Sequence, residues 1–343
     1  MCGDSSTTAR TRKGKLLEIL VTGGAGYIGS TVCSALQDSG HQTVILDSLI
    51  KGKHGGSQGQ NFYQGDISDK QLVQRIVREN PRLEAVIHCA SLIIISESVK
   101  TPFLYYMENF VKSLKFFEIL RHLHINKIVF SSTASIYGDT DGSLVTEDSA
   151  IKPGNPYAKT KAAIEMALED FCYSHALRAI SLRYFNPIGA DPKMRSGMEL
   201  SHSSHILGKL ISAKYVTNEP FIITGTQWPT RDGTGIRDYI HVWDLAMAHV
   251  QALEKFDDIV SMSQPYIPIN LGTGEGTTVL EMVKTFENVI GDKVEKITSS
   301  PRPGDVAGAF ANRNRAEKLL KWHPQMSLEQ AILDSIKWHQ QNT

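Results

Sequence analysis

Short apolar runs alternate with longer amphipathic stretches over the first half of the chain. The apolar runs are rich in Val and Ile and show no alternation of apolar and polar positions, as expected for strands buried on both faces. The predicted strands span residues 18–22, 43–46, 61–64, 85–89, 127–130 and 177–182, and the predicted helices span residues 27–39, 70–80, 103–122 and 156–175. Strands that alternate with helices indicate βαβ units around a parallel sheet, so the predicted fold class is α/β.

The pattern becomes less regular beyond residue 186, where Ser, Gly and Pro are more frequent and the elements are shorter. The predicted elements there are helices at residues 240–255, 278–290, 315–321 and 328–340 and a strand at residues 267–271. We expect a flexible N-terminal tail over residues 1–15, a sheet domain over 16–185 and a smaller substrate-binding region over 186–343. Residues 240–255 and 267–271 are expected to return to the sheet domain.

The composition excludes several classes of protein. Apolar residues make up 41% of the chain, and 36 Lys and Arg balance 36 Asp and Glu, so the basic excess of a nucleic-acid-binding protein is missing. No segment approaches the roughly 20 consecutive apolar residues of a membrane helix, and the N-terminus lacks the apolar core of a secretory signal. The four cysteines show no CxxC spacing. We therefore expect a cytoplasmic protein without a metal site.

A glycine-rich turn joins the first predicted strand to the first predicted helix. Its residues are Gly23, Gly26, Tyr27, Ile28 and Gly29. Small residues let the backbone approach a pyrophosphate, whose charge is then stabilised by the helix N-terminus. Asp47, followed by Ser48, ends the second strand and can accept both hydroxyl groups of an adenosine ribose while repelling a 2′-phosphate. The motif predicts a doubly wound, Rossmann-type sheet that binds NAD rather than NADP; a purely structural glycine turn is the alternative.

Two further strand ends carry groups that suit a dinucleotide. Asp66 and Ile67 follow the third strand, where the carboxylate could bind the adenine amino group. Cys89, Ala90 and Ser91 follow the fourth strand, and their small side chains could lie along the nicotinamide half. Each segment alone is also typical of an ordinary strand-to-helix turn. Together they lie at the carboxyl edge of a parallel sheet, where open α/β sheets bind ligands.

Tyr157 and Lys161 are the candidate catalytic pair. Their spacing places them on one face of a predicted helix. A nearby ammonium and an oxidised nicotinamide both favour the phenolate, so we expect the pKa of Tyr157 to fall below its ordinary value of about 10 and the phenolate to act as a base. Thr133, at the end of the preceding strand, is the candidate proton relay, and Ser131 and Ser132 are candidates for cofactor and substrate contacts. Taken alone, a solvated Tyr/Lys pair and turn hydroxyls are the alternatives.

These motifs together resemble the extended short-chain dehydrogenase/reductase family. The resemblance covers residues 18–339 and rests on residues 23–29, 131–134, 183–187 and 232–242 and on the Tyr157/Lys161 pair. The glycine and Tyr/Lys motifs are shared by the whole superfamily. Residues 183–187 and 232–242 are more specific, and they resemble the branch of UDP-glucose (UDP-galactose) 4-epimerases.

The resemblance implies an N-terminal Rossmann domain, a firmly bound NAD and 4-epimerisation of a UDP-hexose. In the implied cycle Tyr157, helped by Thr133, removes the proton of the sugar C4 hydroxyl, a 4-keto sugar rotates in the pocket, and hydride returns to its other face. The resemblance also implies cofactor contacts from Asn109, Tyr184 and Phe185. Ile93 departs from the pattern, because many members have a lysine there that contacts the cofactor.

Substrate contacts are carried over residue by residue. The implied contacts to the nucleotide diphosphate come from Asn186, His205, Arg237, Arg302 and, at the uridine ribose, Asp305. An arginine fork binds phosphate oxygens bidentately, although each arginine alone is also typical of a surface charge. His205 stands where many members have paired asparagines, and a core or surface histidine is the alternative. Ala309 falls on the wall of the hexose pocket, and its small side chain predicts room for a 2-acetamido group.

The sequence leaves alternative functions open and leaves the oligomeric state undetermined. An epimerase of UDP-uronates or UDP-pentoses fits the same residues. A 4,6-dehydratase fits less well, because Ala134 and Ser135 stand where such enzymes carry Asp-Glu, and a catalytically silent NAD-binding protein would typically lack Tyr157 or Lys161. The resemblance implies a homodimer formed through the two long helices predicted above; burial of these helices against their own sheet is the alternative.

Overall fold

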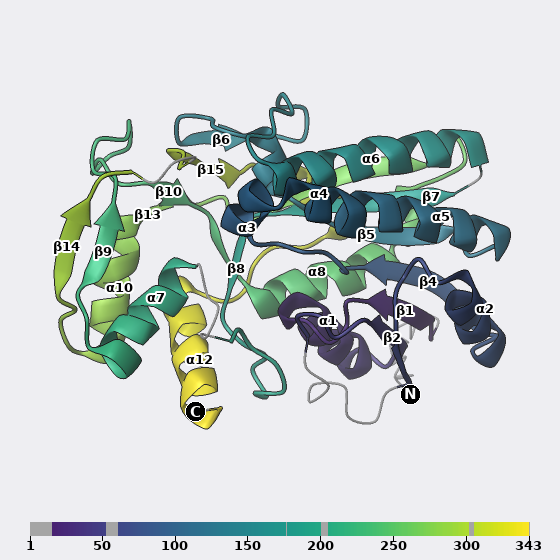
Figure 1. Cartoon of the computed structure of the whole chain (residues 1–343), viewed down its shortest axis with the longest axis horizontal. Helices are drawn as coiled ribbons and strands as arrows, with labels where there is room; N and C mark the ends of the chain where they lie inside the picture. Colours follow the sequence, from purple (N-terminus) through teal and green to yellow (C-terminus); the bar gives the residue numbers. More distant parts are fainter. Residues whose placement is uncertain (1–15, 53–60, 176, 200–204, 302–304, 343) are drawn as a thin grey trace, which may run out of the picture.

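The computed structural model describes residues 16–52, 61–175, 177–199, 205–301 and 305–342 (Figure 1). The tail predicted over residues 1–15 and the predicted phosphate-binding residue Arg302 lie outside the described residues.

A seven-stranded parallel sheet forms the centre of the larger domain. Its strands are β1 (Glu18–Thr22), β2 (Gln42–Asp47), β3 (Asn61–Gln64), β4 (Leu83–His88), β5 (Lys127–Thr133), β7 (Arg178–Tyr184) and β12 (Tyr266–Leu271). Their spatial order is β12-β7-β5-β4-β1-β2-β3. The chain therefore runs outward from β1 to β3 and then crosses back to β4, which creates a switch point between β1 and β4 where doubly wound sheets bind ligands.

Helices cover both faces of this sheet (Figure 1). One face packs against α1 (Tyr27–Asp38), α8 (Val242–Glu254) and α11 (Asn314–Leu320), and the other against α2 (Lys70–Glu79), α5 (Lys112–His122) and α6 (Pro156–His175). The two hydrophobic clusters contain the fully buried Val and Ile residues of the strands. This arrangement confirms the predicted α/β fold with a doubly wound parallel sheet.

The smaller domain lies on the left in Figure 1. Its four-stranded sheet has the order β13-β10-β15-β6 and is accompanied by the pairs β11-β8 and β14-β9. These strands are β6 (Ser143–Val145), β8 (Asn186–Ile188), β9 (Phe221–Thr224), β10 (Ile236–Arg237), β11 (Tyr239–His241), β13 (Thr277–Thr278), β14 (Lys296–Ser299) and β15 (Gly308–Ala311). Strands β8, β9 and β11 pack with α7 (Ile206–Ser212), α10 (Val279–Ile290) and α12 (Leu328–Gln341) around a third cluster.

The remaining described helices are short. They are α3 (Ile95–Lys100), α4 (Pro102–Tyr105), the π-helical η2 (Tyr106–Val111), the 3₁₀ turn η3 (Ala134–Tyr137), η5 (Ala213–Thr217) and α9 (Phe256–Ile259). The long helix predicted at residues 103–122 is thus a run of α4, η2 and α5 with a π-helical middle. Within the described ranges, every helix is too short or too polar to cross a membrane.

The seven predicted strands all belong to the large sheet, but the strands of the smaller domain were not predicted. Those strands contain two to four residues, as in β10 and β15, and such short segments show no measurable alternation. The helix expected from residue 240 begins at Val242, because residues 239–241 pair with β8 as the strand β11.

Candidate active site

The glycine turn between β1 and α1 lies directly against the segment that follows β4. Gly23 has a φ of +70°, and a Cβ atom at this position would lie 2.7 Å from the backbone nitrogen of Ala90. A Cβ atom on Gly29 would lie 2.1 Å from the carbonyl oxygen of Gly23. Gly26 caps α1 without a side chain, so the first amides of the helix point toward a space that an anion can occupy. The turn therefore fits the pyrophosphate of a dinucleotide.

Asp47 ends β2 beside this turn and is tied to it. Its Oδ2 accepts a hydrogen bond from the backbone N–H of Ala25 at 3.0 Å, and its Oδ1 accepts one from the N–H of Leu49 at 2.8 Å. A carboxylate has about four lone-pair positions, so two remain for ligand hydroxyls. The neighbouring Ser48 is exposed. This placement is compatible with the predicted ribose contact, and the bond to Ala25 was not foreseen.

Both carboxylate oxygens of Asp66 bind protein groups, which the sequence did not predict. Its Oδ1 accepts hydrogen bonds from the N–H and the hydroxyl of Ser68 at 2.8 and 2.7 Å, and its Oδ2 lies 2.5 Å from Nζ of Lys112. Partial burial raises the pKa of the Asp66 carboxyl, but the bonds from Lys112 and Ser68 outweigh it and keep that pKa below its usual value. Ile67 is buried in the core, so a ligand contact from this residue would use its backbone.

Asn109 fixes the segment that follows β4. Its Oδ1 accepts a hydrogen bond from the N–H of Leu92 at 2.8 Å, and its Nδ2 donates to the carbonyl of Leu92 at 3.0 Å and to the hydroxyl of Thr160 at 3.2 Å. The side chain is fully buried and both of its donors are used. Asn109 therefore positions the backbone next to Ser91, and its contact to the cofactor stays a prediction.

A directed chain of hydrogen bonds ends at Cys89. Nδ1 of His249 lies 2.9 Å from the carbonyl oxygen of Leu245 and must donate to it, so in the neutral ring Nε2 accepts from the Ser131 hydroxyl at 3.0 Å. Burial lowers the pKa of His249 to about 4, which keeps the ring neutral. The Ser131 oxygen lies 3.0 Å from Sγ of Cys89, and burial raises the pKa of that thiol to about 11. No sequence motif pointed to His249.

The hydroxyl of Ser131 is therefore committed to His249, and its carbonyl is bound as well. Nζ of Lys161 donates to that carbonyl at 2.8 Å and lies 4.8 Å from the centre of the Phe130 ring. Burial lowers the pKa of Lys161 to about 8. The contact of Ser131 to the cofactor stays a prediction.

Tyr157 and Thr133 meet as expected, but the pKa of the phenol moves in the direction opposite to the prediction. Tyr157 is buried beside Leu92 and Tyr105. This burial raises the pKa of Tyr157 to about 12, although its hydrogen bond with Thr133 acts to lower it. The expected lowering relied on the Lys161 ammonium together with an oxidised nicotinamide. In the structure that ammonium is bonded to a backbone carbonyl of β5, and the pKa of about 12 is that of the protein without the nicotinamide.

The side chain of Ser132 points into the core. Its side chain is fully buried and its hydroxyl donates to the carboxylate of Glu165. Its only hydroxyl proton is directed into the core, so a substrate contact from Ser132, which stays a prediction, would use other atoms of this residue.

Arg237 lies on β10 with its guanidinium held by backbone carbonyls. Nη1 donates to Ile236 at 2.7 Å and to Ala307 at 3.0 Å, and Nη2 donates to Val306 at 3.3 Å. Nε and the second Nη2 hydrogen have no partner in the described part of the chain, so one edge of the fork is available to an anion. Gly308 permits this packing: its φ is +121°, and a Cβ atom there would lie 2.3 Å from Nη1 of Arg237.

Asp238, the next residue, gathers the elements around Arg237. Its carboxylate accepts hydrogen bonds from the N–H groups of Thr273, Gly274 and Ala311 at 2.7, 3.0 and 3.0 Å and from the Thr273 hydroxyl at 2.7 Å. Its carbonyl accepts from the N–H of Asn186 at 2.9 Å. Burial nevertheless raises the pKa of Asp238. Sequence reasoning quoted the motif that contains this residue but gave it no role.

Ala309 lies opposite Arg237 in the register of β15 and β10. Its methyl group packs in the same cluster as Phe185 and Ala134, the residue that follows Thr133. The structure thus brings the predicted pocket wall next to the predicted catalytic strand.

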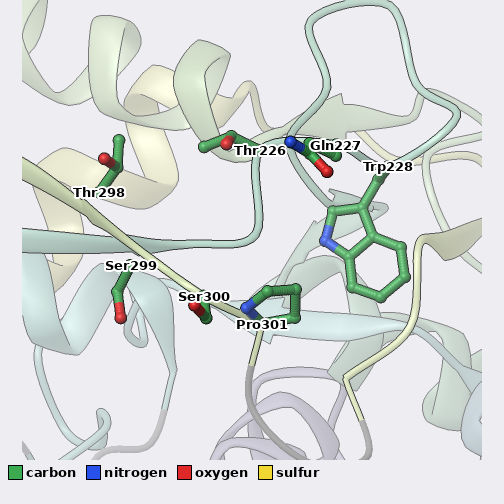
Figure 2. A pocket seen from close by; sticks show the side chains of 7 residues that line it. All are labelled: Thr226, Gln227, Trp228, Thr298, Ser299, Ser300 and Pro301. Carbon is green, nitrogen blue, oxygen red and sulfur yellow. The ribbon is translucent and has the colours of Figure 1, made fainter.

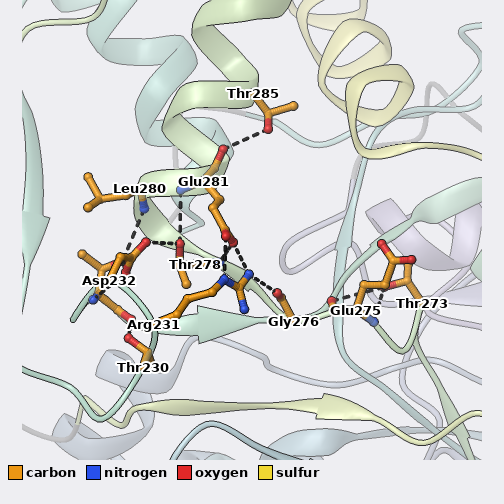
Figure 3. A network of polar contacts seen from close by, with 11 residues as sticks. Thr230, Arg231, Asp232, Thr273, Glu275, Gly276, Thr278, Leu280, Glu281 and Thr285 are labelled. Atoms are coloured by element: carbon orange, nitrogen blue, oxygen red, sulfur yellow. Dashed lines mark hydrogen bonds and ion pairs between the residues drawn. The ribbon is translucent and has the colours of Figure 1, made fainter.

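A second polar network shapes the turn that leads into β10 (Figure 3). Nε of Arg231 donates to Glu281 at 2.6 Å, and Nη2 donates to the same carboxylate and, at 2.6 Å, to the carbonyl of Gly276. Asp232 accepts from the hydroxyl of Thr278, which also forms the capping box of α10 with Glu281. These contacts join the start of the 232–242 motif to β13 and α10.

The remaining predicted residues are more dispersed. The Tyr27 hydroxyl donates to the carbonyl of Gly189 at 2.8 Å, which joins α1 to the smaller domain instead of leaving the hydroxyl for a cofactor. Ile28 packs against the core, and the Tyr184 ring lies 6.3 Å from that of His249. His205 precedes α7, where burial lowers its pKa, and Asp305 is partly buried.

A separate surface cavity of about 700 Å³ lies at the ends of β9 and β14 (Figure 2). It is lined by Thr226, Gln227, Trp228, Thr298, Ser299, Ser300 and Pro301. None of these residues belongs to the predicted site, and all of them except Trp228 are exposed.

Comparison with known proteins shows what the whole chain is similar to. Residues 19–272 match the model of the "NAD dependent epimerase/dehydratase family". A UDP-glucose 4-epimerase of Bacillus subtilis is 40% identical over 336 residues, which cover 95% of this chain and 98% of the relative. A crystal structure of a UDP-glucose 4-epimerase from Stenotrophomonas maltophila with bound NAD and formylated UDP-arabinopyranose has 34% identity and a TM-score of 0.89, covering 95% and 98% of the two chains.

One further structure bears on the breadth of the site. The UDP-Glc/GlcNAc 4-epimerase of Campylobacter jejuni has 30% identity and a TM-score of 0.79, and the match covers 95% of this chain and 99% of that one.

The buried ammonium of Lys161 predicts a pH-dependent effect on stability. The pKa of Lys161 is about 8 in the folded protein and 10.5 for a free lysine, so the unfolded chain holds the proton more tightly. The destabilisation by the buried charge is therefore full below pH 8 and fades as the pH rises toward 10.5. We expect Lys161→Met to raise the Tm at pH 7 and this gain to shrink between pH 8 and 10, measured by thermal unfolding at matched cofactor content. Lys159→Met, exposed on the same helix, is the control. A Tm difference for Lys161→Met that does not change with pH would contradict the assignment.

Proposed function

The chain belongs to the NAD dependent epimerase/dehydratase family, and we propose that it interconverts UDP-glucose and UDP-galactose by reversible oxidation at C4 of the hexose. The observation that carries the proposal is the hydrogen bond between Tyr157 and Thr133 at the carboxyl end of β5, on the sheet edge that also bears the glycine turn. Relatives with this activity in their names match nearly the full length of the chain.

The cofactor is NAD, and the residues around the switch point suit it. The glycine turn would hold the pyrophosphate, Asp47 the adenosine ribose, and the segment Cys89–Ser91 the nicotinamide half. The Asp47 charge disfavours a 2′-phosphate and so favours NAD over NADP. When bound there, NAD accepts a hydride from the sugar carbon and later returns it.

The chain's own part in the chemistry is to move one proton. The Tyr157 phenolate would accept the proton of the C4 hydroxyl as the hydride leaves C4, and the resulting phenol would return that proton when the hydride comes back. Burial raises the pKa of Tyr157 to about 12, so forming the phenolate near neutral pH requires positive charge nearby. Thr133 lies beside it and orients the sugar hydroxyl. A positive charge near the phenol lowers its pKa, and Lys161, one helical turn away, is the protein group that supplies such a charge.

The substrate's diphosphate would bind to the free edge of Arg237, with Asn186 on the adjacent strand. Arg302, Asp305 and His205 are the further candidates. A firm grip on the diphosphate leaves the hexose free to present either face, because none of these groups binds the sugar ring.

Replacing Tyr157 by phenylalanine tests the function and the residue together. We expect Tyr157→Phe to lower kcat for conversion of UDP-galactose to UDP-glucose by about 10²–10⁴-fold while NAD stays bound, because the proton carrier is lost and the ring is kept. Tyr215→Phe, at an exposed tyrosine outside the site and outside the exposed apolar patch described below, should keep normal kcat. Near-normal kcat in Tyr157→Phe would remove this residue from the mechanism. If the parent enzyme acts on UDP-glucuronate or UDP-arabinose instead of either UDP-hexose, the substrate assignment is wrong.

We further propose that the enzyme accepts UDP-N-acetylhexosamines. The methyl group of Ala309 stands near the catalytic strand and opposite Arg237, where a larger side chain would narrow the hexose pocket. The similarity to an epimerase named for both UDP-Glc and UDP-GlcNAc supports this proposal.

A larger side chain at Ala309 tests whether this residue leaves room for the 2-acetamido group. We expect Ala309→Tyr to lower kcat/KM for UDP-N-acetylgalactosamine by at least about 10-fold more than for UDP-galactose, because steric overlap in a packed site is costly. The measurement is kcat/KM for both substrates in the parent and in the variant. An unchanged ratio would show that Ala309 is not the wall.

The protein is also proposed to be a homodimer. Large apolar side chains lie exposed on α3, α4, η2 and α6, which pack side by side at the top of Figure 1. They are Ile95, Val99, Phe103, Leu104, Tyr106, Met166 and Tyr173. Two copies related by a two-fold axis can bury this patch by packing it against the same patch of the partner. The helices of the two copies would then form a four-helix bundle.

Charges placed in this patch should separate the protomers. We expect the double variant Phe103→Glu/Met166→Glu to elute and scatter light as a monomer, because both side chains are more than half exposed in the single chain and would be buried in the dimer. Met262→Glu, equally exposed outside the patch, should leave the mass unchanged. A dimer that persists in the double variant would place the interface elsewhere.

A further inference from the structure

One face of α6 holds the end of β5 at three successive residues. Tyr157, Lys161 and Glu165, spaced by four residues, contact Thr133, the carbonyl of Ser131 and the hydroxyl of Ser132, respectively. The first two contacts involve groups of the proposed chemistry. The third, between Glu165 and Ser132, involves side chains that are both buried.

The carboxylate of Glu165 is itself fixed by an ion pair. Nε of Arg183 lies 3.1 and 3.0 Å from its two oxygens, and Nη2 lies 2.6 Å from Oε2. The Tyr266 hydroxyl adds a hydrogen bond at 3.1 Å. A guanidinium that grips a carboxylate at both oxygens fixes its orientation as well as its position.

Arg183 is held in turn by groups outside α6. Its Nη1 donates to the Tyr137 hydroxyl at 3.0 Å and to the carbonyl of Glu147 at 3.0 Å. Tyr137 then donates to Asn270 on β12 at 2.6 Å. The position of the Glu165 carboxylate is therefore set by β7, by β12 and by the turn after β5, and it does not depend on α6 alone.

A buried ion pair is weak evidence for stability, because desolvation offsets most of the attraction. A fixed hydrogen-bond acceptor at the end of a strand has a geometric consequence instead. Ser132 stands between the carbonyl that binds Lys161 and the side chain that meets Tyr157, so a shift of its Cβ moves both.

We propose that Glu165 is a positioning residue for the reaction: held by Arg183, it fixes Ser132 and thereby sets the Ser131 carbonyl and the Thr133 hydroxyl at the distances that Lys161 and Tyr157 require. The inference rests on the proposed function only in that these residues carry out the chemistry. It assigns a role to Arg183 in the 183–187 motif, which substrate binding and the proton relay leave without one.

The test uses Ser132, because Glu165→Gln would leave the buried charge of Arg183 unpaired at a cost to folding. Ser132→Ala removes only the bond between the strand and the ion pair. Ser181→Ala is the matched control, since Ser181 is equally buried, bonds to Tyr266 in the same network at 3.0 Å and does not contact β5's catalytic end through its side chain. Both variants make the same chemical change.

We expect Ser132→Ala to lower kcat for UDP-galactose by about 10- to 100-fold with KM within about 2-fold of the parent, because small displacements of catalytic groups have effects of this size. The pH profile of kcat should also move in Ser132→Ala, since the partners of Tyr157 and Lys161 shift. Ser181→Ala should keep kcat and the pH profile. Equal kcat values in the two variants would overturn the proposal, and a rise in KM alone in Ser132→Ala would show that this hydroxyl contacts the substrate.

A readout that is independent of activity separates this proposal from the proposed function. In hydrogen–deuterium exchange of the NAD-bound protein, the peptide covering residues 127–137 should exchange at least about 5-fold faster in Ser132→Ala than in Ser181→Ala, because the strand end has lost its anchor. If the parent enzyme converts no UDP-sugar but this difference is seen, the function is wrong and the positioning stands. If exchange is the same in both variants, the positioning is wrong whatever the substrate.

Discussion

The buried carboxylate of Asp238 joins the two halves of the molecule. Its oxygens accept four hydrogen bonds from the loop after β12 and from the end of β15, while its carbonyl holds the start of β8. An aspartate accepts at both oxygens and donates at neither, so no amide could satisfy the same set of N–H donors. Arg237, Asn186 and Ala309 thus owe their common location to one residue that contacts no ligand itself.

Close backbone approach is the second constraint on the site. At the cofactor end, Gly23 lets the β1 turn touch the segment after β4, and at the substrate end Gly308 lets β15 pass directly beside the Arg237 guanidinium. A side chain at Gly23 would displace the backbone of Ala90, and one at Gly308 would displace the Arg237 guanidinium. The glycines therefore set the shape of the binding surface more than its chemistry, which comes from Asp47 and Arg237.

The sequence predicts the sheet and its helices better than the hydrogen-bond partners of individual buried side chains. The seven long strands and the pairing of Tyr157 with Thr133 follow from local pattern and motif. The raised pKa of Tyr157 does not follow from the sequence. It depends on burial, and the Lys161 ammonium bonds to the Ser131 carbonyl, which only the packed structure shows. The same holds for Asn109: only the packed structure shows that its amide bonds to the backbone of Leu92.

The burial of Cys89 behind Ser131 and His249 has a practical consequence for chemical labelling. A thiol with a pKa near 11 presents almost no thiolate at neutral pH, and thiolate is the species that maleimides, iodoacetamide and peroxides attack. The other two described cysteines, Cys33 and Cys172, are buried as well. A cysteine introduced on the exposed surface should therefore react well ahead of these three thiols. Cys2, the fourth cysteine, lies outside the described residues, so a labelling variant would replace that residue first.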